Sequence, residues 1–282
     1  MTRIKEVNIP WPKIFLGLAV VATVAGALFA TKTLSSIEKN IAAAKEAARP
    51  ANIRLTKITT PNCNNCFNVD SVLATLKKQN VTVGEEKTVA FDSEEAQALV
   101  KKLGIKRLPT YIFTGEVNKS NLESFVKING EVKNNTFIFT KVTPIFIDPE
   151  TGKKMGLVDI TYLTDSTCSD CYDPIKVQKP ILTGGYGVGI SSERTVDINS
   201  GAGQSLVNQY KITKIPTILL SSGADQYVNL KNVWKNVGTV ESDGFYVFRQ
   251  MQQLGNVVYK DLASNKVIRP SVASSSASQS GQ

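Results

Sequence analysis

The chain has 282 residues, of which 42% are hydrophobic and 20% charged, so it can hold two ordinary domains and is too apolar to be disordered throughout. It contains no histidine, which excludes Ser-His and Cys-His catalytic pairs and histidine-ligated metal sites. The formal net charge is +9, but the sequence has no basic run interleaved with aromatic residues, which a nucleic-acid-binding surface would need. We therefore expect no nucleic-acid binding.

An uncharged apolar segment follows the short basic N-terminal segment, residues 1–13. Residues 14–31 carry no charged side chain, and as a helix rising about 1.5 Å per residue they nearly match a hydrocarbon core of about 30 Å. The sequence therefore predicts a transmembrane helix. A cleaved signal peptide is the alternative, because Ala25-Gly26-Ala27 resembles a cleavage site. We favour an uncleaved anchor, because the apolar run is longer than the ~7–15 residues that are usual for the apolar region of a signal peptide.

The segments flanking the folded part are predicted from their composition. Residues 32–50 are rich in helix formers up to Pro50, which predicts an exposed helical linker. Residues 271–282 are mostly serine, glutamine and glycine, which predicts a disordered tail. Lys and Arg flank residues 14–31 on both sides, so their distribution does not decide the membrane orientation.

Alternating strand and helix patterns follow residue 50 and predict an α/β unit. The expected strands cover 53–58, 87–91 and 110–113. The expected helices cover 67–79 and 92–104, the second beginning at the cap-like Asp92 or Ser93 and ending at Gly104. Further apolar stretches occupy 122–132 and 136–142. Stretches 145–148 and 155–163 flank a turn at 149–152, which predicts a hairpin whose second strand also begins the next unit.

The pattern occurs twice. Residues 91–110 align with 198–217 without a gap, and residues 122–137 align with 230–245 at nearly the same spacing. The four cysteines all belong to the repeat, as two CxxC pairs: Cys63, Cys66, Cys168 and Cys171. Each pair precedes an apolar-Pro-Thr run, namely Leu108-Pro109-Thr110 and Ile215-Pro216-Thr217. We therefore predict two domains, 51–155 and 156–270.

Each repeat resembles a thioredoxin-fold domain in its order of strand, CxxC, helix, strand, helix and Pro-Thr strand. The resemblance implies an α/β fold with two tandem thioredoxin-like domains after an N-terminal transmembrane helix. This two-domain arrangement is similar to the disulfide-isomerase and tandem protein disulfide oxidoreductase group. The similarity implies that the protein needs no cofactor beyond its own cysteines. It also implies cis bonds before Pro109 and Pro216. The residues around these prolines are then expected to bind an extended substrate backbone: Leu108, Pro109, Thr110, Ile215, Pro216 and Thr217.

The cysteine spacing suits thiol–disulfide exchange. A first cysteine at a helix N-terminus would be stabilised as a thiolate, and a second cysteine three residues on can resolve a mixed disulfide. This predicts Cys63 and Cys168 as nucleophiles, with Cys66 and Cys171 as resolving partners. Asp170 should oppose thiolate formation at Cys168, so we predict that the two sites differ in redox potential.

The chain departs from the thioredoxin pattern in three ways. The residues between the cysteines, Asn64-Asn65 and Ser169-Asp170, include none of the usual proline or histidine, no tryptophan precedes either pair, and the usual buried acid is missing. Six residues before each first cysteine, where thioredoxins commonly hold a buried acid, it has Lys57 and Tyr162. Other carboxylates, including Glu95, Asp159 and Asp165, are expected to serve as exposed caps or turn residues. Proton transfer to the resolving cysteines is therefore unassigned.

Two other functions stay open. One is a membrane-anchored binding scaffold whose CxxC pairs are structural disulfides. The other is a CxxC metal protein, which is less favoured because zinc ribbons separate their pairs by only ~15–20 residues, whereas Cys66 and Cys168 are much further apart. We predict no metal site.

The leading prediction is a membrane-tethered thiol–disulfide oxidoreductase at the cell membrane, with its thioredoxin-like domains outside the cytoplasm. The expected partners are client proteins with thiols or disulfides, a redox partner protein, and the lipid bilayer through residues 14–31.

Overall fold

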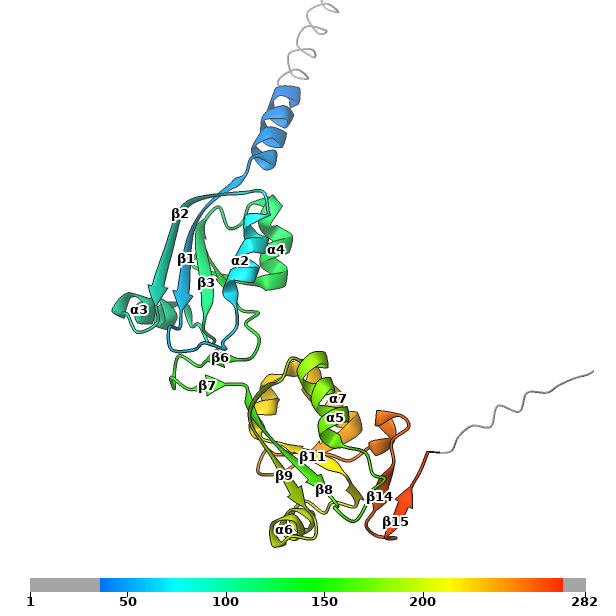
Figure 1. Ribbon diagram of the computed structural model, residues 1–282. Coiled ribbons are helices and arrows are strands. Elements are labelled where there is room, and N and C mark those ends of the chain that lie inside the picture. Colours follow the sequence, from blue (N-terminus) through cyan, green and yellow to red (C-terminus); the bar gives the residue numbers. More distant parts are fainter. Residues whose placement is uncertain (1–35, 271–282) are drawn as a thin grey trace, which may run out of the picture.

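The computed structural model describes residues 36–270, which include two α/β units, each built on a five-stranded mixed sheet (Figure 1). Residues 36–48 form an exposed helix ahead of the first sheet, as the sequence predicts. The predicted transmembrane helix, residues 14–31, and the predicted tail, residues 271–282, lie outside the described residues. Among residues 36–270, none of the helices has the length and apolar character that crossing a membrane requires.

The first sheet is arranged around β1 (Ala51–Thr59), which pairs in parallel with β2 (Val81–Ala90) and antiparallel with β3 (Thr110–Gly115). β5 (Thr136–Phe139) pairs antiparallel with β3, and β4 (Gly130–Lys133) forms the edge. The order is β2-β1-β3-β5-β4. These strands confirm the predicted α/β pattern, although β2 begins earlier than predicted because the exposed residues 84–88 separate the half-buried Val81 and Val83 from the apolar end of the strand.

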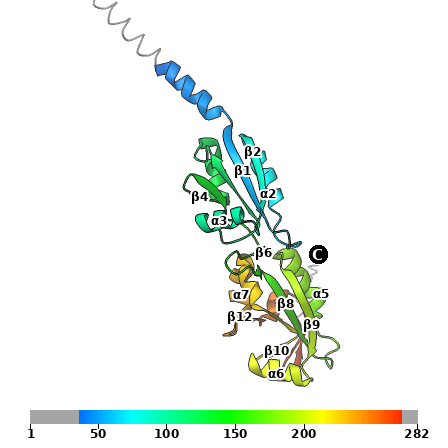
Figure 2. The same ribbon diagram turned by 90° about the vertical axis from the view of Figure 1, so that its left-hand side faces the viewer.

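Helices cover both faces of this sheet. α2 (Val69–Lys77) and α4 (Glu123–Asn129) lie on one face, and α3 (Glu94–Leu103) lies on the other (Figures 1 and 2). A 3-10 turn, η1 (Ser120–Leu122), precedes α4. The core under α2 and α4 includes Leu73, Leu76, Phe113 and Phe125. The core under α3 includes Ala96, Val100 and Leu103. The alternation of buried side chains along β1 supplies both cores.

The ends of α3 follow the sequence signals. The Ser93 side chain accepts a hydrogen bond from the Ala96 N–H at 3.2 Å, and Gly104 ends the helix with a φ of 69°. Serine is a favoured N-cap, and glycine adopts the left-handed C-terminal position without a steric cost. In the second unit, Ser200 accepts from the Gly203 N–H at 3.0 Å in the same way.

The second sheet repeats the order of the first. Its strands are β8 (Leu157–Thr164), β9 (Gly189–Asp197), β11 (Thr217–Leu220), β12 (Gly238–Val240) and β13 (Tyr246–Phe248). Its order is β9-β8-β11-β13-β12, with β8 and β9 parallel. Its helices are α5 (Pro174–Pro180), the π-helix η2 (Ile181–Gly185), α6 (Gly201–Gln209), η3 (Ser222–Gln226) and α7 (Val228–Val237).

A short hairpin follows each sheet. Hairpin 1, residues 146–155, contains β6 (Phe146–Ile147) and β7 (Lys154–Met155). Hairpin 2, residues 259–268, contains β14 (Tyr259–Asp261) and β15 (Lys266–Ile268), follows the turn η4 (Met251–Leu254), and pairs with β10 (Lys214–Ile215). The predicted turn at 149–152 lies between β6 and β7, which confirms hairpin 1.

The prediction that hairpin 1 continues directly into the next sheet is wrong. β7 and β8 belong to different sheets, and Gly156 separates them with a φ of 88°. A Cβ at Gly156 would lie 2.5 Å from the Pro144 Cβ. The positive φ and this close approach both require glycine, so the chain changes direction here.

Candidate functional site

Both CxxC pairs form disulfides within turns of the chain. The Cα atoms are 5.3 Å apart in Cys63–Cys66 and 5.4 Å apart in Cys168–Cys171. In each turn, the N–H of the second cysteine donates to the carbonyl oxygen of the first, at 3.3 Å and 3.2 Å respectively. Cys63 is buried, with 8% of its surface exposed, whereas the other three cysteines are half-buried. The predicted nucleophile of the first site is therefore less accessible than its partner.

The prediction that each cysteine pair begins a helix is wrong. α2 begins at Val69 and α5 at Pro174, after N-caps at Asn68 and Asp173. The cap side chains accept hydrogen bonds from the N–H groups of residues 70 and 175, at 3.0 Å and 2.9 Å. Asn and Asp cap helices well, and these caps lie beyond the cysteines.

The peptide bonds before Pro109 and Pro216 are cis, as the resemblance implied. All six residues of the two apolar-Pro-Thr runs are buried. The hydroxyl group of Thr110 donates to the Phe139 carbonyl oxygen at 2.7 Å, and that of Thr217 donates to the Phe248 carbonyl oxygen at 2.6 Å. The two proline segments are thus held to the neighbouring strand by the same buried hydrogen bond.

The two hairpins connect each CxxC turn to its cis-proline. In the first unit, the Phe67 N–H donates to the Ile145 carbonyl oxygen at 2.7 Å. Leu108 and Ile147 exchange two backbone hydrogen bonds, at 3.0 Å and 2.7 Å. The segment 145–147, which leads into and forms the first strand of hairpin 1, therefore contacts both the residue after the second cysteine and the residue before the proline.

The second unit repeats this arrangement. The Tyr172 N–H donates to the Val258 carbonyl oxygen at 2.9 Å, and Ile215 pairs with Lys260 in the antiparallel β10–β14 ladder. The Leu262 N–H donates to the Thr213 carbonyl oxygen at 2.8 Å, beside this pair. The backbone edges that the resemblance assigns to an extended substrate are thus both occupied by the chain itself.

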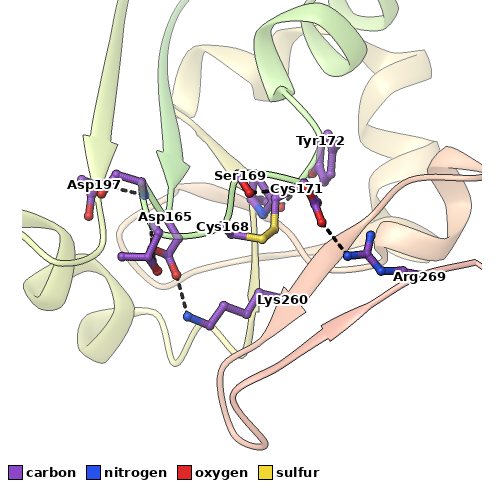
Figure 3. Close-up of a disulfide and its surroundings, with 12 residues drawn as sticks. Asp165, Cys168, Ser169, Cys171, Tyr172, Asp197, Lys260 and Arg269 are labelled. Carbon is purple, nitrogen blue, oxygen red and sulfur yellow. Dashed lines mark hydrogen bonds and ion pairs between the residues drawn. A yellow bond between two sulfur atoms is a disulfide. The ribbon is translucent and has the colours of Figure 1, made fainter.

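A buried carboxylate lies beside the second disulfide (Figure 3). Asp165 has 1% of its side chain exposed and pairs with Lys260 of β14 at 2.8 Å. It also accepts from the hydroxyl of Thr167 at 2.6 Å and from the Asn199 amide at 3.1 Å. Burial by itself raises the pKa of Asp165, but the hydrogen bonds from Lys260, Thr167 and Asn199 outweigh it and hold the pKa far below its usual range.

Asp165 corrects the expectation of an exposed turn residue. Its ion-pair partner is 95 positions away in the sequence, so no local pattern marked it. The carbonyl oxygen of Asp165 also accepts from the Cys168 N–H at 3.0 Å. The first unit has Thr60 at this place, accepting from the Cys63 N–H at 3.0 Å. The buried charge therefore distinguishes the second site from the first.

The carboxylate between the second pair of cysteines is neutralised from outside the turn. Asp170 forms an exposed ion pair with Arg269, just beyond β15 (Figure 3). The Arg269 guanidinium lowers the pKa of Asp170. The negative charge expected to oppose the Cys168 thiolate is therefore partly offset by a nearby cation.

The surroundings of the first disulfide are less charged. The Lys154 ammonium group donates to the Asn65 side-chain oxygen at 3.1 Å. A cavity of about 160 Å³ lies beside Cys63, and Ile147 and Gly152 of hairpin 1 form part of its wall. The space next to Cys63 is therefore bounded by the hairpin.

The two positions that replace the buried acid of thioredoxins serve other contacts. Lys57 pairs with Asp70. Tyr162 is buried and donates to the Glu193 carboxylate at 2.8 Å. Burial of the Tyr162 phenol, together with this contact, raises its pKa. Among the described residues, no group of three or more Cys, Asp or Glu side chains is arranged to hold a metal ion.

Comparison with known proteins gives no family model and no curated protein that matches this chain. Solved structures with a similar backbone include the N-terminal domain of alkylhydroperoxide reductase AhpF from Enterococcus faecalis. It is 16% identical, with 66% of this chain and 89% of that chain covered and a TM-score of 0.21. Another is ERdj5, 8% identical, with coverages of 64% and 25% and a TM-score of 0.19. At such low scores, we draw no functional conclusion from either likeness.

Proposed function

We propose that this protein is a thiol–disulfide oxidoreductase with two thioredoxin-like domains in series, residues 51–155 and 156–270, tethered to a membrane by residues 14–31. The observation that carries the proposal is the repeated environment of the two CxxC disulfides. In each unit, one short backbone segment contacts both the residue after the second cysteine and the residue before a cis-proline. A disulfide that served only to tie a loop would need no such proline segment.

The proposed reaction exchanges one disulfide for another. A client thiolate attacks a CxxC sulfur, the CxxC bond breaks, and a mixed disulfide forms. The second client thiolate then attacks the mixed disulfide, which leaves the client oxidised and the CxxC pair as a dithiol. In the reverse direction, Cys63 or Cys168 attacks a client disulfide and Cys66 or Cys171 releases the reduced client. A redox partner protein restores the starting state, and the relative potentials set the direction.

Trapping of mixed disulfides tests the proposal. Cys66→Ser and Cys171→Ser variants each retain a first cysteine that can attack a client but lack the group that resolves the intermediate. We expect covalent adducts with extracytoplasmic proteins, and we expect reductant to release them. The matched Cys63→Ser/Cys66→Ser and Cys168→Ser/Cys171→Ser variants are the controls. The absence of adducts from both single variants would contradict the proposal.

A membrane-anchored scaffold with structural disulfides is the second candidate. It is favoured by the occupied backbone edges at Leu108 and Ile215 and by the start of both helices beyond the cysteines. Structural disulfides typically have potentials below about −300 mV. Titration of each pair against thiol buffers therefore separates the candidates: a higher potential at either pair supports exchange, and lower potentials at both support a scaffold.

A further inference from the structure

Hairpins 1 and 2 fill the same position in the two units, but they are held there in different ways. Hairpin 1 is attached to a five-stranded sheet on both sides, since the chain reaches it from β5 and leaves it for β8. Hairpin 2 follows β13, and through residue 270 the chain does not return to a five-stranded sheet. Hairpin 1 is therefore tethered to a five-stranded sheet at both of its ends, whereas hairpin 2 is tethered to one at a single end.

Side-chain packing reinforces this difference. Phe146 of hairpin 1 is 4% exposed and belongs to the core under α2 and α4. The Arg107 guanidinium lies over its ring, 4.3 Å from the centroid. Ile145, just before the hairpin, is packed so closely against the second unit that a Cβ on Gly189 would lie 2.5 Å from its Cδ1 atom. Hairpin 1 is thus part of the packed junction between the units.

Hairpin 2 depends more on charge. Its contact with the CxxC turn includes the Lys260–Asp165 pair, with side chains 17% and 1% exposed. The second ion pair, Arg269–Asp170, has side chains 59% and 54% exposed and contributes little by comparison. Tyr259 anchors the start of the hairpin in the core, whereas Val267 on β15 is 40% exposed. Two residue pairs join β10 to β14, and a single pair, Leu108–Ile147, occupies the equivalent edge at hairpin 1, so the backbone pairing does not explain the difference between the hairpins.

We propose that hairpin 2 is a displaceable cover over the second disulfide, with the Lys260–Asp165 ion pair as its latch. While the hairpin is closed, Lys260 occupies the backbone partner position of Ile215. When it opens, an extended polypeptide can replace β14 and recover the same backbone hydrogen bonds. This rests on the proposed function only in identifying the incoming strand as a client. Hairpin 1 stays closed, so an extended client reaches Cys168–Cys171 more readily than Cys63–Cys66.

The Lys260–Asp165 ion pair can act as a latch because of where its two residues lie. Lys260 lies on β14, within the residue pair that covers the Ile215 edge, while Asp165 directly follows β8 and begins the loop that leads into the cysteines. A single contact therefore joins the cover to the turn that it covers. Removal of Lys260 leaves Asp165 without this partner and weakens the closed state more than loss of an exposed pair would.

Hydrogen exchange in the full chain tests the cover without any redox chemistry. The variant is Lys260→Gln, and the reporters are the amides of Tyr172 and Leu262, which both bond to backbone across the hairpin contact. We expect roughly tenfold or faster exchange at these amides, the consequence of losing a charged hydrogen bond. The amides of Phe67, Leu108 and Ile147 at hairpin 1 should be unchanged. Arg269→Gln is the control with an exposed pair.

A double variant, Asp165→Asn with Lys260→Gln, keeps the test valid if the single variant misfolds, because it leaves no unpaired buried charge. Faster exchange confined to hairpin 2 in either folded variant supports the cover. Unchanged exchange at Tyr172 and Leu262 would overturn it. Equal acceleration through the central strands β8 and β11 would also overturn it, since hairpin 2 would then open only when the whole unit unfolds.

Reaction rates separate this inference from the proposed function. The oxidised protein is mixed either with dithiothreitol or with an extended synthetic peptide that carries one cysteine. The rate at which each reagent reacts with the Cys168–Cys171 disulfide is then measured. We expect Lys260→Gln to accelerate the peptide reaction at Cys168–Cys171 several-fold more than the dithiothreitol reaction. If no peptide reacts but Tyr172 and Leu262 still exchange faster, the cover stands and the proposed function fails. If the peptide reacts equally with both proteins and exchange is unchanged, the cover fails and the proposed function stands.

Discussion

The hydroxyl group of Tyr172 donates a hydrogen bond to the carbonyl oxygen of Pro216 at 2.8 Å. This contact joins the residue after the second disulfide directly to the cis-proline of the same unit. The first unit has Phe67 at the equivalent place, and its ring stacks on Phe139 at a centroid distance of 5.8 Å. The residue after the CxxC turn is therefore hydrogen-bonded directly to the cis-proline in the second unit, whereas in the first unit it packs on strand β5.

Tyr172→Phe removes this polar contact and retains the aromatic ring. We expect the second unit to lose about 1–2 kcal/mol of stability, because the Pro216 carbonyl oxygen loses a partner in a half-buried place. Denaturant unfolding followed by a probe in the second unit measures the change. Tyr186→Phe is the control, since its ring lies at a pocket lined mostly by apolar side chains. Equal losses of stability in the two variants would show that the Tyr172–Pro216 hydrogen bond contributes no more than the Tyr186 hydroxyl group does.

The buried threonine after each proline should contribute equally to the stability of its unit. Thr110→Val and Thr217→Val preserve side-chain shape but remove the hydroxyl groups that donate to the Phe139 and Phe248 carbonyl oxygens. Each change leaves a carbonyl group without this donor, at a cost of about 1–3 kcal/mol. Separate unfolding curves for the two variants check this. A cost in one unit only would contradict the structural equivalence of the proline segments.

Asp165 should make the protein less stable in acid. Its pKa is lowered in the folded state, whereas an unfolded aspartate titrates near pH 4. Below roughly that pH, the unfolded chain takes up a proton that folded Asp165 does not, so the stability it contributes declines as the pH falls. Asp165→Asn should cost up to about 3 kcal/mol at neutral pH, because Lys260 is left buried without its anion.

The unfolding midpoint measured against pH tests this effect. Asp165→Asn should flatten the loss of stability below pH 4 relative to the unchanged protein. Asp170→Asn, which alters an exposed ion pair, should leave the acid limb of the curve nearly unchanged. An Asp165→Asn curve parallel to that of the unchanged protein would contradict the assignment.

Asp170→Asn should also raise the reduction potential of Cys168–Cys171. Removing a carboxylate beside the sulfurs stabilises the thiolate of the reduced form. The site is exposed and Arg269 already offsets the charge, so we expect a rise of no more than roughly 20 mV. Equilibration with glutathione buffers measures it, and Cys63–Cys66 in the same protein is the internal control. A fall in potential would mean that another effect controls the second site.

Local sequence signals predicted much of the fold correctly. The strands around 53–58 and 110–113 follow apolar β patterns, and α3 begins after a serine cap and ends at a glycine in a left-handed conformation. The sequence placed the helices that follow the cysteine pairs too early. The apolar periodicity extends back to Phe67, but the caps that begin these helices, Asn68 and Asp173, lie beyond each pair.

By itself, the sequence determined that the chain contains two copies of one α/β unit, each with a CxxC pair and a Pro-Thr strand, because these features are local and repeat at nearly constant spacing. Only the tertiary structure decided what surrounds them. The occupied edges at Leu108 and Ile215 and the buried Lys260–Asp165 pair join segments far apart in the chain. Such contacts depend on how the hairpins return to the sheets, and no local periodicity or spacing encodes that return.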